Sequence, residues 1–299
     1  MRDIYSILNQ RQKSKPERLP KEEFIEKLKQ QKKALYDMSD QQALNVTSHP
    51  DSYIHYLSML SQFDYTVTNT LLIMAQKPEA TLLKDSEHWR NDKYYIKKGE
   101  KGIQILEPQG EYVKEDGSTG TSYAVKYVFD VSQINAKIKV NALYMSTENI
   151  LSELTYDTSI VLKNDDTLIS HQNVLYSPAE KTIYYRSNLT ENELVQGMIR
   201  EFCYAEFDQQ YTNFDRQRDH FIVESSAYIL CSRLGVNVEK KDFADKVSQE
   251  FYGMDARQIK EELVNIKDLS SDVYSRIERG IYKMQQQTLQ TPQPQQEAR

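Results

Sequence analysis

The sequence predicts a two-domain α+β protein, in which helices and a small antiparallel sheet precede a second set of short strands and helices. Apolar residues recur at helical spacing over residues 21–76. Short alternating or aromatic-rich runs separated by glycines follow up to residue 131, and helical patterns dominate after residue 190. The length of 299 residues is enough for two domains that each bury a core.

The first domain is expected at residues 21–140, after a loosely held basic arm at residues 1–20. Its first helix should run from Lys21 to about Asn45, where apolar positions repeat at helical spacing. A second helix follows Pro50. A third, TVTNTLLIMAQ, should stop before Pro78, because the residue preceding a proline disfavours the helical conformation.

Strands are expected next, in four short runs punctuated by Gly99, Gly102 and Gly110. The DGSTG turn predicts that the last two runs form a hairpin. A polar connection between about residues 132 and 146 is expected to separate the domains. The four runs are residues 93–96, 103–107, 110–114 and 122–131.

The second domain, expected at residues 141–284, should open with a helix after Ser146 and contain strands at 158–162 and 183–186. Gly235 is well placed to cap one of its helices. The glutamine- and proline-rich residues 285–299 are expected to be disordered, because they cannot bury enough apolar surface. Its helices are predicted near residues 190–209, 217–234, 239–251 and 255–285, the last broken around Asp268.

The composition limits the classes of function. No apolar run approaches the roughly 20 residues of a membrane span, and the N-terminus MRDIYSILNQ lacks the apolar region of a signal peptide. Cys203 and Cys231 each lie inside a helical pattern and have no metal-type spacing, which argues against a disulfide framework and favours a reducing cytoplasm. We therefore expect no membrane partner.

The net charge of −6 is unevenly distributed along the chain. Residues 1–150 carry 21 Lys and Arg against 20 Asp and Glu, whereas residues 151–299 carry 17 against 24. A polyanion would therefore meet the first half, at +1, rather than the second half, at −7. The chain also has 21 tyrosines and one tryptophan, and tyrosine can stack on bases as well as fill a core.

The segment WRNDKYYIKKGEKG at residues 89–102 interleaves aromatic residues with cations. Aromatic rings stack on unpaired bases and cations follow phosphates, which is how proteins hold single strands without reading their sequence. A solvated hairpin, with Trp89 in the core, is the alternative interpretation. The candidate single-stranded DNA contacts are Trp89, Arg90, Lys93, Tyr94, Tyr95, Lys97, Lys98 and Lys101.

Four pieces of the first half resemble, in their order, the N-terminal domain of ArdC-type antirestriction proteins and of LtrC-like proteins of conjugative elements. They are N-x-L-L-I-x-x-Q-x-P, a tryptophan, K-K-G-E-K-G-I-x-I-L and V-F-D-V-S-Q, within residues 21–135. The resemblance implies a domain that binds single-stranded DNA. It adds Asn69 and Gln76 as candidate contacts, although both could instead hydrogen-bond to an adjacent segment.

ArdC-like proteins have a second domain that resembles a zinc metallopeptidase, with a helix carrying H-E-x-x-H and a later glutamate ligand. The resemblance implies a zincin-like domain here, a short sheet plus helices. The stretch IREFCYAEF matches the first helix, but Arg200 and Tyr204 stand where that motif has histidines. Glu201 corresponds to the general base, and Glu224, in IVESSAYILCSRLG, to the third ligand.

The substitutions oppose metal binding. A peptidase needs two neutral imidazoles on one helical face, an arginine cannot ligate a cation, and tyrosine is a poor zinc ligand at neutral pH. We therefore expect a catalytically inactive domain without metal or other cofactor, in which Arg200 pairs with Glu201 or Glu224. His220 remains a possible weak ligand, four positions before Glu224.

These observations predict a cytoplasmic single-stranded DNA-binding protein of a mobile or conjugative element, antirestriction or transfer-associated, with a degenerate metallopeptidase domain. Two other classes stay open. One is an active metallopeptidase with an atypical site. The other is a protein-binding inhibitor of restriction enzymes or a binder of conjugation proteins, which the acidic second half would suit.

Overall fold

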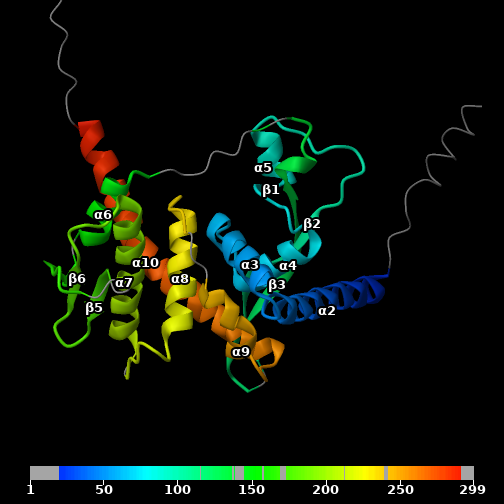
Figure 1. Ribbon diagram of the computed structural model, residues 1–299. Coiled ribbons are helices and arrows are strands. Elements are labelled where there is room, and N and C mark those ends of the chain that lie inside the picture. The colour runs from blue at the N-terminus through cyan, green and yellow to red at the C-terminus, as the bar shows by residue number, and fades with distance from the viewer. Residues whose placement is uncertain are drawn as a thin grey trace, which may run out of the picture.

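In the computed structural model, two groups of elements, each built around a three-stranded sheet, pack side by side against long helices (Figure 1). The structure describes residues 20–136, 138 and 145–290, apart from 115, 157, 169–172, 212 and 239–241, and only the backbone of 280–290. The predicted arm at 1–20 lies outside this part except for Pro20, as do residues 291–299 of the predicted tail. The mixed helix and sheet content confirms the α+β class.

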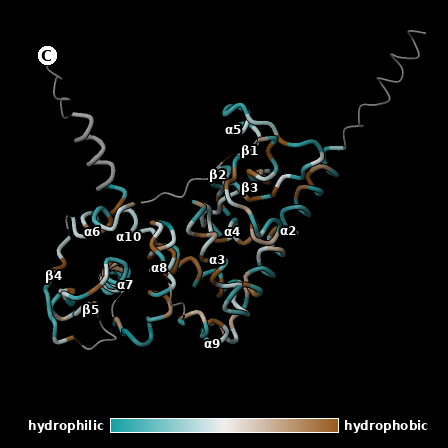
Figure 2. The backbone as a smooth tube through the Cα atoms, turned by 45° about the horizontal axis from the view of Figure 1, so that its top comes forward, coloured by the Kyte–Doolittle hydropathy of each residue, from teal (hydrophilic) through white to brown (hydrophobic). Residues whose placement is uncertain are grey.

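The first group begins with three helices, as predicted. Their caps explain the boundaries: Pro50 opens the second helix, and the hydroxyl of Thr66 accepts the N–H of Asn69 at the start of the third. Figure 2 shows hydrophilic and hydrophobic stretches alternating along the first helix, as expected when one face is packed. The helices are α2 (Lys21–Val46), α3 (Pro50–Gln62) and α4 (Val67–Gln76).

The first sheet has the strand order β1-β3-β2, and both pairings are antiparallel. The predicted hairpin at the DGSTG turn is confirmed, with Val113 opposite Thr119 and Gly117 at a φ of 82°. The prediction of a strand at 93–96 was wrong, because only Ile96 forms a bridge there. The elements are β1 (Leu83–Asp85), α5 (Ser86–Asn91), β2 (Ile103–Val113), β3 (Thr119–Asp130) and the 3-10 turn η1 (Val131–Gln133).

The second group contains a mixed sheet of order β4-β6-β5, in which β4 is parallel and β5 antiparallel to β6. The long helix that follows β6 packs against β5. This helix opens with a capping box, in which Thr190 and Glu193 satisfy each other's backbone N–H groups. The elements up to this helix are α6 (Thr147–Thr155), β4 (Val161–Asn164), β5 (Val174–Ser177), β6 (Thr182–Tyr185) and α7 (Glu191–Gln210).

The C-terminal helices differ from the prediction in two places. The expected helix at 239–251 is replaced by a 3-10 turn and a single helical turn. No break occurs at Asp268, because a continuous stripe of Leu263, Ile266, Leu269 and Val273 is buried along one face. Gly235, at a φ of 74°, follows α8 as predicted. The elements are α8 (His220–Arg233), η2 (Asp242–Lys246), α9 (Val247–Glu250) and α10 (Ala256–Gln290).

Two large hydrophobic clusters form the core, and α8 and α10 contribute to both of them. The first cluster joins α3, α4 and the first sheet to Tyr228 and Ile229 of α8, so it includes residues from both sides of the polar connection. The hydroxyl of Tyr53 donates to Ser225 Oγ at 2.8 Å across this contact. Among the described residues, no helix is both long and apolar enough to cross a bilayer.

Candidate functional site

The predicted basic segment forms an exposed turn that leads into β2. Gly99 has a φ of 91°, a conformation that L side chains rarely adopt, so the turn favours glycine at this position. Within the part of the chain that the structure describes, Arg90, Lys98 and Lys101 are exposed and form no hydrogen bond or ion pair through their side chains. Their charges therefore remain available to an anionic partner.

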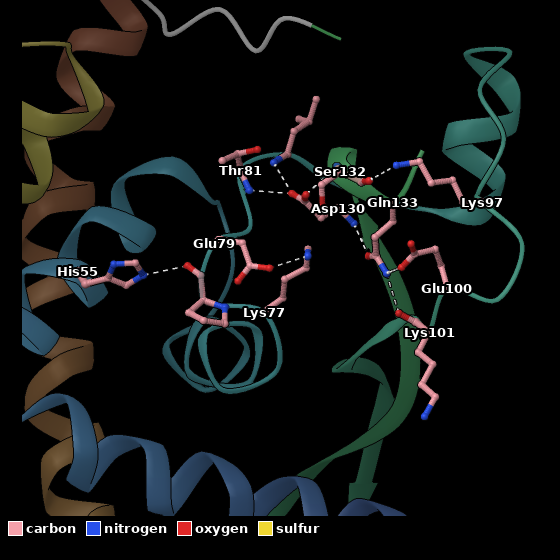
Figure 3. A network of polar contacts seen from close by, with 12 residues as sticks. His55, Lys77, Glu79, Thr81, Lys97, Glu100, Lys101, Asp130, Ser132 and Gln133 are labelled. Carbon is pink, nitrogen blue, oxygen red and sulfur yellow. Dashed lines mark hydrogen bonds and ion pairs between the residues drawn. The ribbon is translucent and has the colours of Figure 1, made fainter. Parts of the chain in front are cut away.

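The turn is held in place by the segment that ends β3 (Figure 3). The Gln133 amide donates to Glu100 Oε2 and to the carbonyl oxygen of Lys101, both at 2.9 Å. The Lys97 ammonium donates to the Ser132 carbonyl at 2.7 Å, so this charged group is engaged within the protein. In Figure 3 the side chain of Lys101 points away from these contacts. The scaffold fixes the backbone of the turn and leaves Lys101 extended.

Asp130 anchors this scaffold and is only 1% exposed. Its carboxylate accepts backbone N–H groups from Thr81 at 2.7 Å, Leu82 at 3.1 Å and Ser132 at 2.8 Å. Burial alone would raise the pKa of Asp130, but these hydrogen bonds outweigh it and lower the pKa below its ordinary value. The D-V-S-Q piece, residues 130–133, therefore forms a capping box that holds the basic turn in place.

The aromatic members of the segment divide between core and surface. Trp89 is 1% exposed and donates its indole N–H to the Phe129 carbonyl at 2.9 Å, so it packs in the core and is not available for stacking on a base. Tyr94 is half-buried and meets the Trp89 ring edge-on. Tyr95 is 66% exposed, and the side chain of Lys93 is exposed as well.

The side-chain amides of Asn69 and Gln76 both hydrogen-bond to the backbone at the free edge of β2. The Asn69 amide donates to the Leu106 carbonyl and accepts the Leu106 N–H, both at 2.9 Å. Gln76 makes the same pair of bonds with Gln104, also at 2.9 Å. Two amides on α4 thus take the place of a neighbouring strand and protect an unpaired edge. Both side chains therefore stabilise the fold by hydrogen bonds to an adjacent segment, which is the alternative that the sequence left open for them.

The second candidate site centres on Glu201 of α7, whose side chain is fully buried. Its Oε1 accepts hydrogen bonds from Arg200 Nε at 2.9 Å and Arg216 Nη2 at 2.6 Å. Its Oε2 accepts the Tyr176 N–H of β5 at 2.8 Å. Arg200 also donates to the Val174 carbonyl at 3.3 Å. The expected pairing of Arg200 with Glu201 is therefore present, and the pair also ties α7 to the edge of β5.

Tyr204 lies one turn further along α7, where it meets His220 and Arg216. Its hydroxyl forms a hydrogen bond of 2.9 Å with His220 Nδ1. The Arg216 guanidinium lies 3.8 Å from the centroid of the Tyr204 ring, a cation–π contact. Glu224 Oε1 lies 3.8 Å from both Arg200 Nε and His220 Nδ1, in range for charge attraction but too far for a hydrogen bond.

Burial sets the charge states of this cluster. It raises the pKa of Tyr204 well above its ordinary value, so the phenol stays protonated at neutral pH. Burial, together with nearby Lys246, Arg216 and Arg200, lowers the pKa of His220 and keeps the imidazole neutral. Burial also raises the pKa of Glu224, although Arg200 opposes that effect. The cluster thus combines two guanidiniums with two carboxylates around neutral rings.

The donor set does not fit a zincin-type metal ion. Arg200 and Tyr204 stand at the positions where a zincin helix has imidazoles, and the Glu201 carboxylate is fully engaged by two guanidiniums and a backbone N–H. In the described ranges, no three His, Cys, Asp or Glu side chains are grouped so as to hold a metal. A cavity of about 670 Å³ remains beside the cluster, with Arg200, His220 and Glu224 in its wall.

The chain resembles solved structures of one protein in its fold. The Mn(II)-bound crystal structure of the antirestriction protein ArdC from plasmid R388 matches with a TM-score of 0.50 and 13% identity, over 71% of this chain and 85% of that chain. This chain shares the ArdC fold. The metal-free ArdC structure aligns with a TM-score of 0.49 and 14% identity, over 72% and 86%. No family model matches the sequence, and no curated protein matches it.

The resemblance to ArdC proteins stated from the sequence is therefore matched at the level of the fold. Sequence reasoning missed one member of the second site, Arg216, which reaches Glu201 from 15 residues along the chain. Arg216 lies in the mixed-charge stretch RQRDH, where no spacing marks it out. A fully buried glutamate needs hydrogen-bond donors for both of its oxygens, and Arg200, which is partly exposed, cannot supply all of them. This need was the signal that could have indicated a second cation near Glu201.

Proposed function

We propose that this protein binds single-stranded DNA through the exposed turn around Lys98 and Lys101, together with Arg90 and Tyr95. The observation that carries the proposal is that these cations have no partner among the described residues, while Gln133 and Asp130 fix the turn beneath them. A partner-free lysine on an anchored backbone suits a phosphate, which needs only a positioned charge. Tyr95, 66% exposed, can stack on a base.

The second half of the proposal is that the zincin-like group is catalytically inactive and contributes packing or partner binding. A general base must be able to reach a proton on its substrate, whereas Glu201 is fully buried and shared by Arg200 and Arg216. The donor chemistry at Arg200 and Tyr204 supports the same conclusion. The fold persists without the site because fold and function are separable.

The biological setting that we propose is the cytoplasm of a bacterium carrying a plasmid or another mobile element, where the protein serves in antirestriction or in transfer of the strand. The shared fold with an antirestriction protein of a plasmid supports this setting. A single-strand binder would act on DNA that enters a cell in single-stranded form.

Binding of the full-length chain to a fluorescently labelled oligothymidylate tests the first half. We expect affinity to fall as salt rises, with a slope of about −2 in a double-logarithmic plot if three cations each neutralise a phosphate. Fluorescence anisotropy at several salt concentrations measures this slope. Equal affinity for a duplex of the same length, or affinity that does not depend on salt, would contradict the proposal.

Metal analysis tests the second half. After dialysis against Mn(II) or Zn(II) and removal of free ions, we expect far less than one metal per chain, because the imidazole ligands are absent. Elemental analysis by mass spectrometry gives the stoichiometry. One tightly held metal per chain would show that the cluster around Glu224 is a metal site of a different kind.

A further inference from the structure

Four tyrosines follow the seam between α2 and the β2–β3 hairpin, and none of them belongs to the basic turn. We call them the tyrosine row: Tyr127 and Tyr123 of β3, Tyr36 of α2 and Tyr112 of β2. Tyr36, Tyr112 and Tyr127 are 39%, 51% and 45% exposed, and Tyr123 is half-buried. Large aromatic surfaces gathered at one place on a surface indicate a binding function more often than isolated ones do.

Tyr127 stands at the end of the row nearest the basic turn. Its hydroxyl accepts a hydrogen bond of 2.9 Å from Gln31 of α2, which orients the ring. Gly102 also lies against Tyr127, because a Cβ added at Gly102 would come to 3.0 Å from Tyr127 Cβ and from the Phe129 ring. Glycine at this position therefore brings the turn close against Tyr127, and Lys101 is the adjacent residue.

The row continues along β3 toward the hairpin tip. Tyr123 lies four residues from Tyr127 and on the same face of the strand, and it packs near Leu35, beside Tyr36 on α2. Burial raises the pKa of Tyr36, and the nearby Tyr123 and Tyr112 add to this. The Tyr112 ring covers Gly120, where a Cβ would meet it at 2.8 Å.

Cations accompany the row. Lys29 and Lys32 precede Tyr36 by seven and four positions, so the three side chains share one flank of α2. Like Lys101, neither lysine forms a hydrogen bond or an ion pair with any residue that the structure describes. The row is therefore bordered by free ammonium groups at its Tyr127 end and along the helix.

We propose that the tyrosine row is a stacking platform for the unpaired bases of a single strand whose phosphates are held by Lys101, Lys32 and Lys29. The proposal rests on the single-strand binding proposed above and extends it from the turn to α2 and the hairpin. Tyr123 and Tyr127 lie four positions apart on one face of β3, about 13 Å at the rise of a strand. Several bases fit along such a length, as they do in other single-strand grooves.

Alanine variants of the full-length chain test the platform. Tyr127→Ala and Tyr36→Ala are each expected to weaken binding of a labelled oligothymidylate by roughly 5- to 100-fold, the range for loss of one base–aromatic contact. The salt slope should stay unchanged, because no phosphate contact is lost. Tyr127→Phe keeps the ring and should bind nearly as the parent does. Tyr252→Ala, at a tyrosine 87% exposed beside α9, is the matched control and should have no effect.

The outcomes separate this inference from the function on which it rests. If the parent chain binds the oligonucleotide but both alanine variants match it, the platform is overturned and the turn stands alone. If the parent does not bind, the proposed function and the platform both fall. Unchanged DNA affinity with altered sedimentation of the free variants would assign the row to an interface between copies of the chain, which also overturns the proposal. Tyr36→Ala removes a surface side chain without touching the Gln31 bond, so it keeps the test valid if Tyr127→Ala misfolds.

Discussion

Replacement of Glu201 by alanine is expected to lower the free energy of unfolding by about 3 kcal/mol, because it leaves two guanidiniums and a backbone N–H without their acceptor. The value lies at the lower end for a broken buried ion pair, since Arg200 and Arg216 keep 29% and 32% of their side-chain surface exposed. Urea unfolding followed by circular dichroism measures the change.

Glu261→Ala is the control for this prediction. Glu261 pairs with Arg257 on the surface of α10, with side-chain exposures of 61% and 86%. Such a pair contributes only about 0.5 kcal/mol, so the control should be nearly neutral. Equal effects of the two substitutions would show that Glu201 is not a structural anchor. That result would reopen its role as a general base.

Reversal of charge at the turn is expected to have the second large effect. In the double variant Lys98→Glu/Lys101→Glu, two attractive contacts with phosphates, each about 1 kcal/mol in water, become repulsive. Screening by salt reduces the sum, and we expect single-strand affinity to fall roughly 10- to 100-fold at low salt. The salt slope should become shallower by about 1.4, the share of two phosphates on a single strand.

A matched change elsewhere shows whether the effect is local. Lys163→Glu/Arg257→Glu alters the net charge by the same amount, on β4 and on α10, away from the turn. Both binding isotherms are read by fluorescence anisotropy, with the melting temperature as a check on folding. If the two double variants lose affinity equally, only the net charge matters, and the turn is not the binding site.

The parts of the fold that could be predicted from the sequence were those with long periodic patterns. The helices near 21–45 and 190–209 and the hairpin at DGSTG required only local signals, namely apolar spacing, caps and turn residues. The strands β1 and β5 were missed because three or four residues are too few to show a period. Their positions depend on strand pairing with β3 and β6, which lies outside any local window.

The candidate sites show the same division. Pairing of Arg200 with Glu201 could be predicted, since a carboxylate on a buried helical face requires compensation. The uses of Trp89, Asn69 and Gln76 could not be fixed, because each depends on which strand lies opposite. The tyrosine row was invisible for a related reason: its members come from one helix and two strands that only the fold brings together.

Helix α8 has one more consequence. It contributes His220 and Glu224 to the cluster around Glu201, while Tyr228 and Ile229 pack in the core with α3. The fold needs this helix whatever the cluster around Glu201 does, because its removal would expose the packed side of α3 and of the first sheet to water. The packing role of α8 is therefore independent of any chemistry at the cluster around Glu201. Residues of α8 and α10 belong to the same hydrophobic cluster as α3, α4 and the first sheet, so these helices stabilise the half that carries the basic turn.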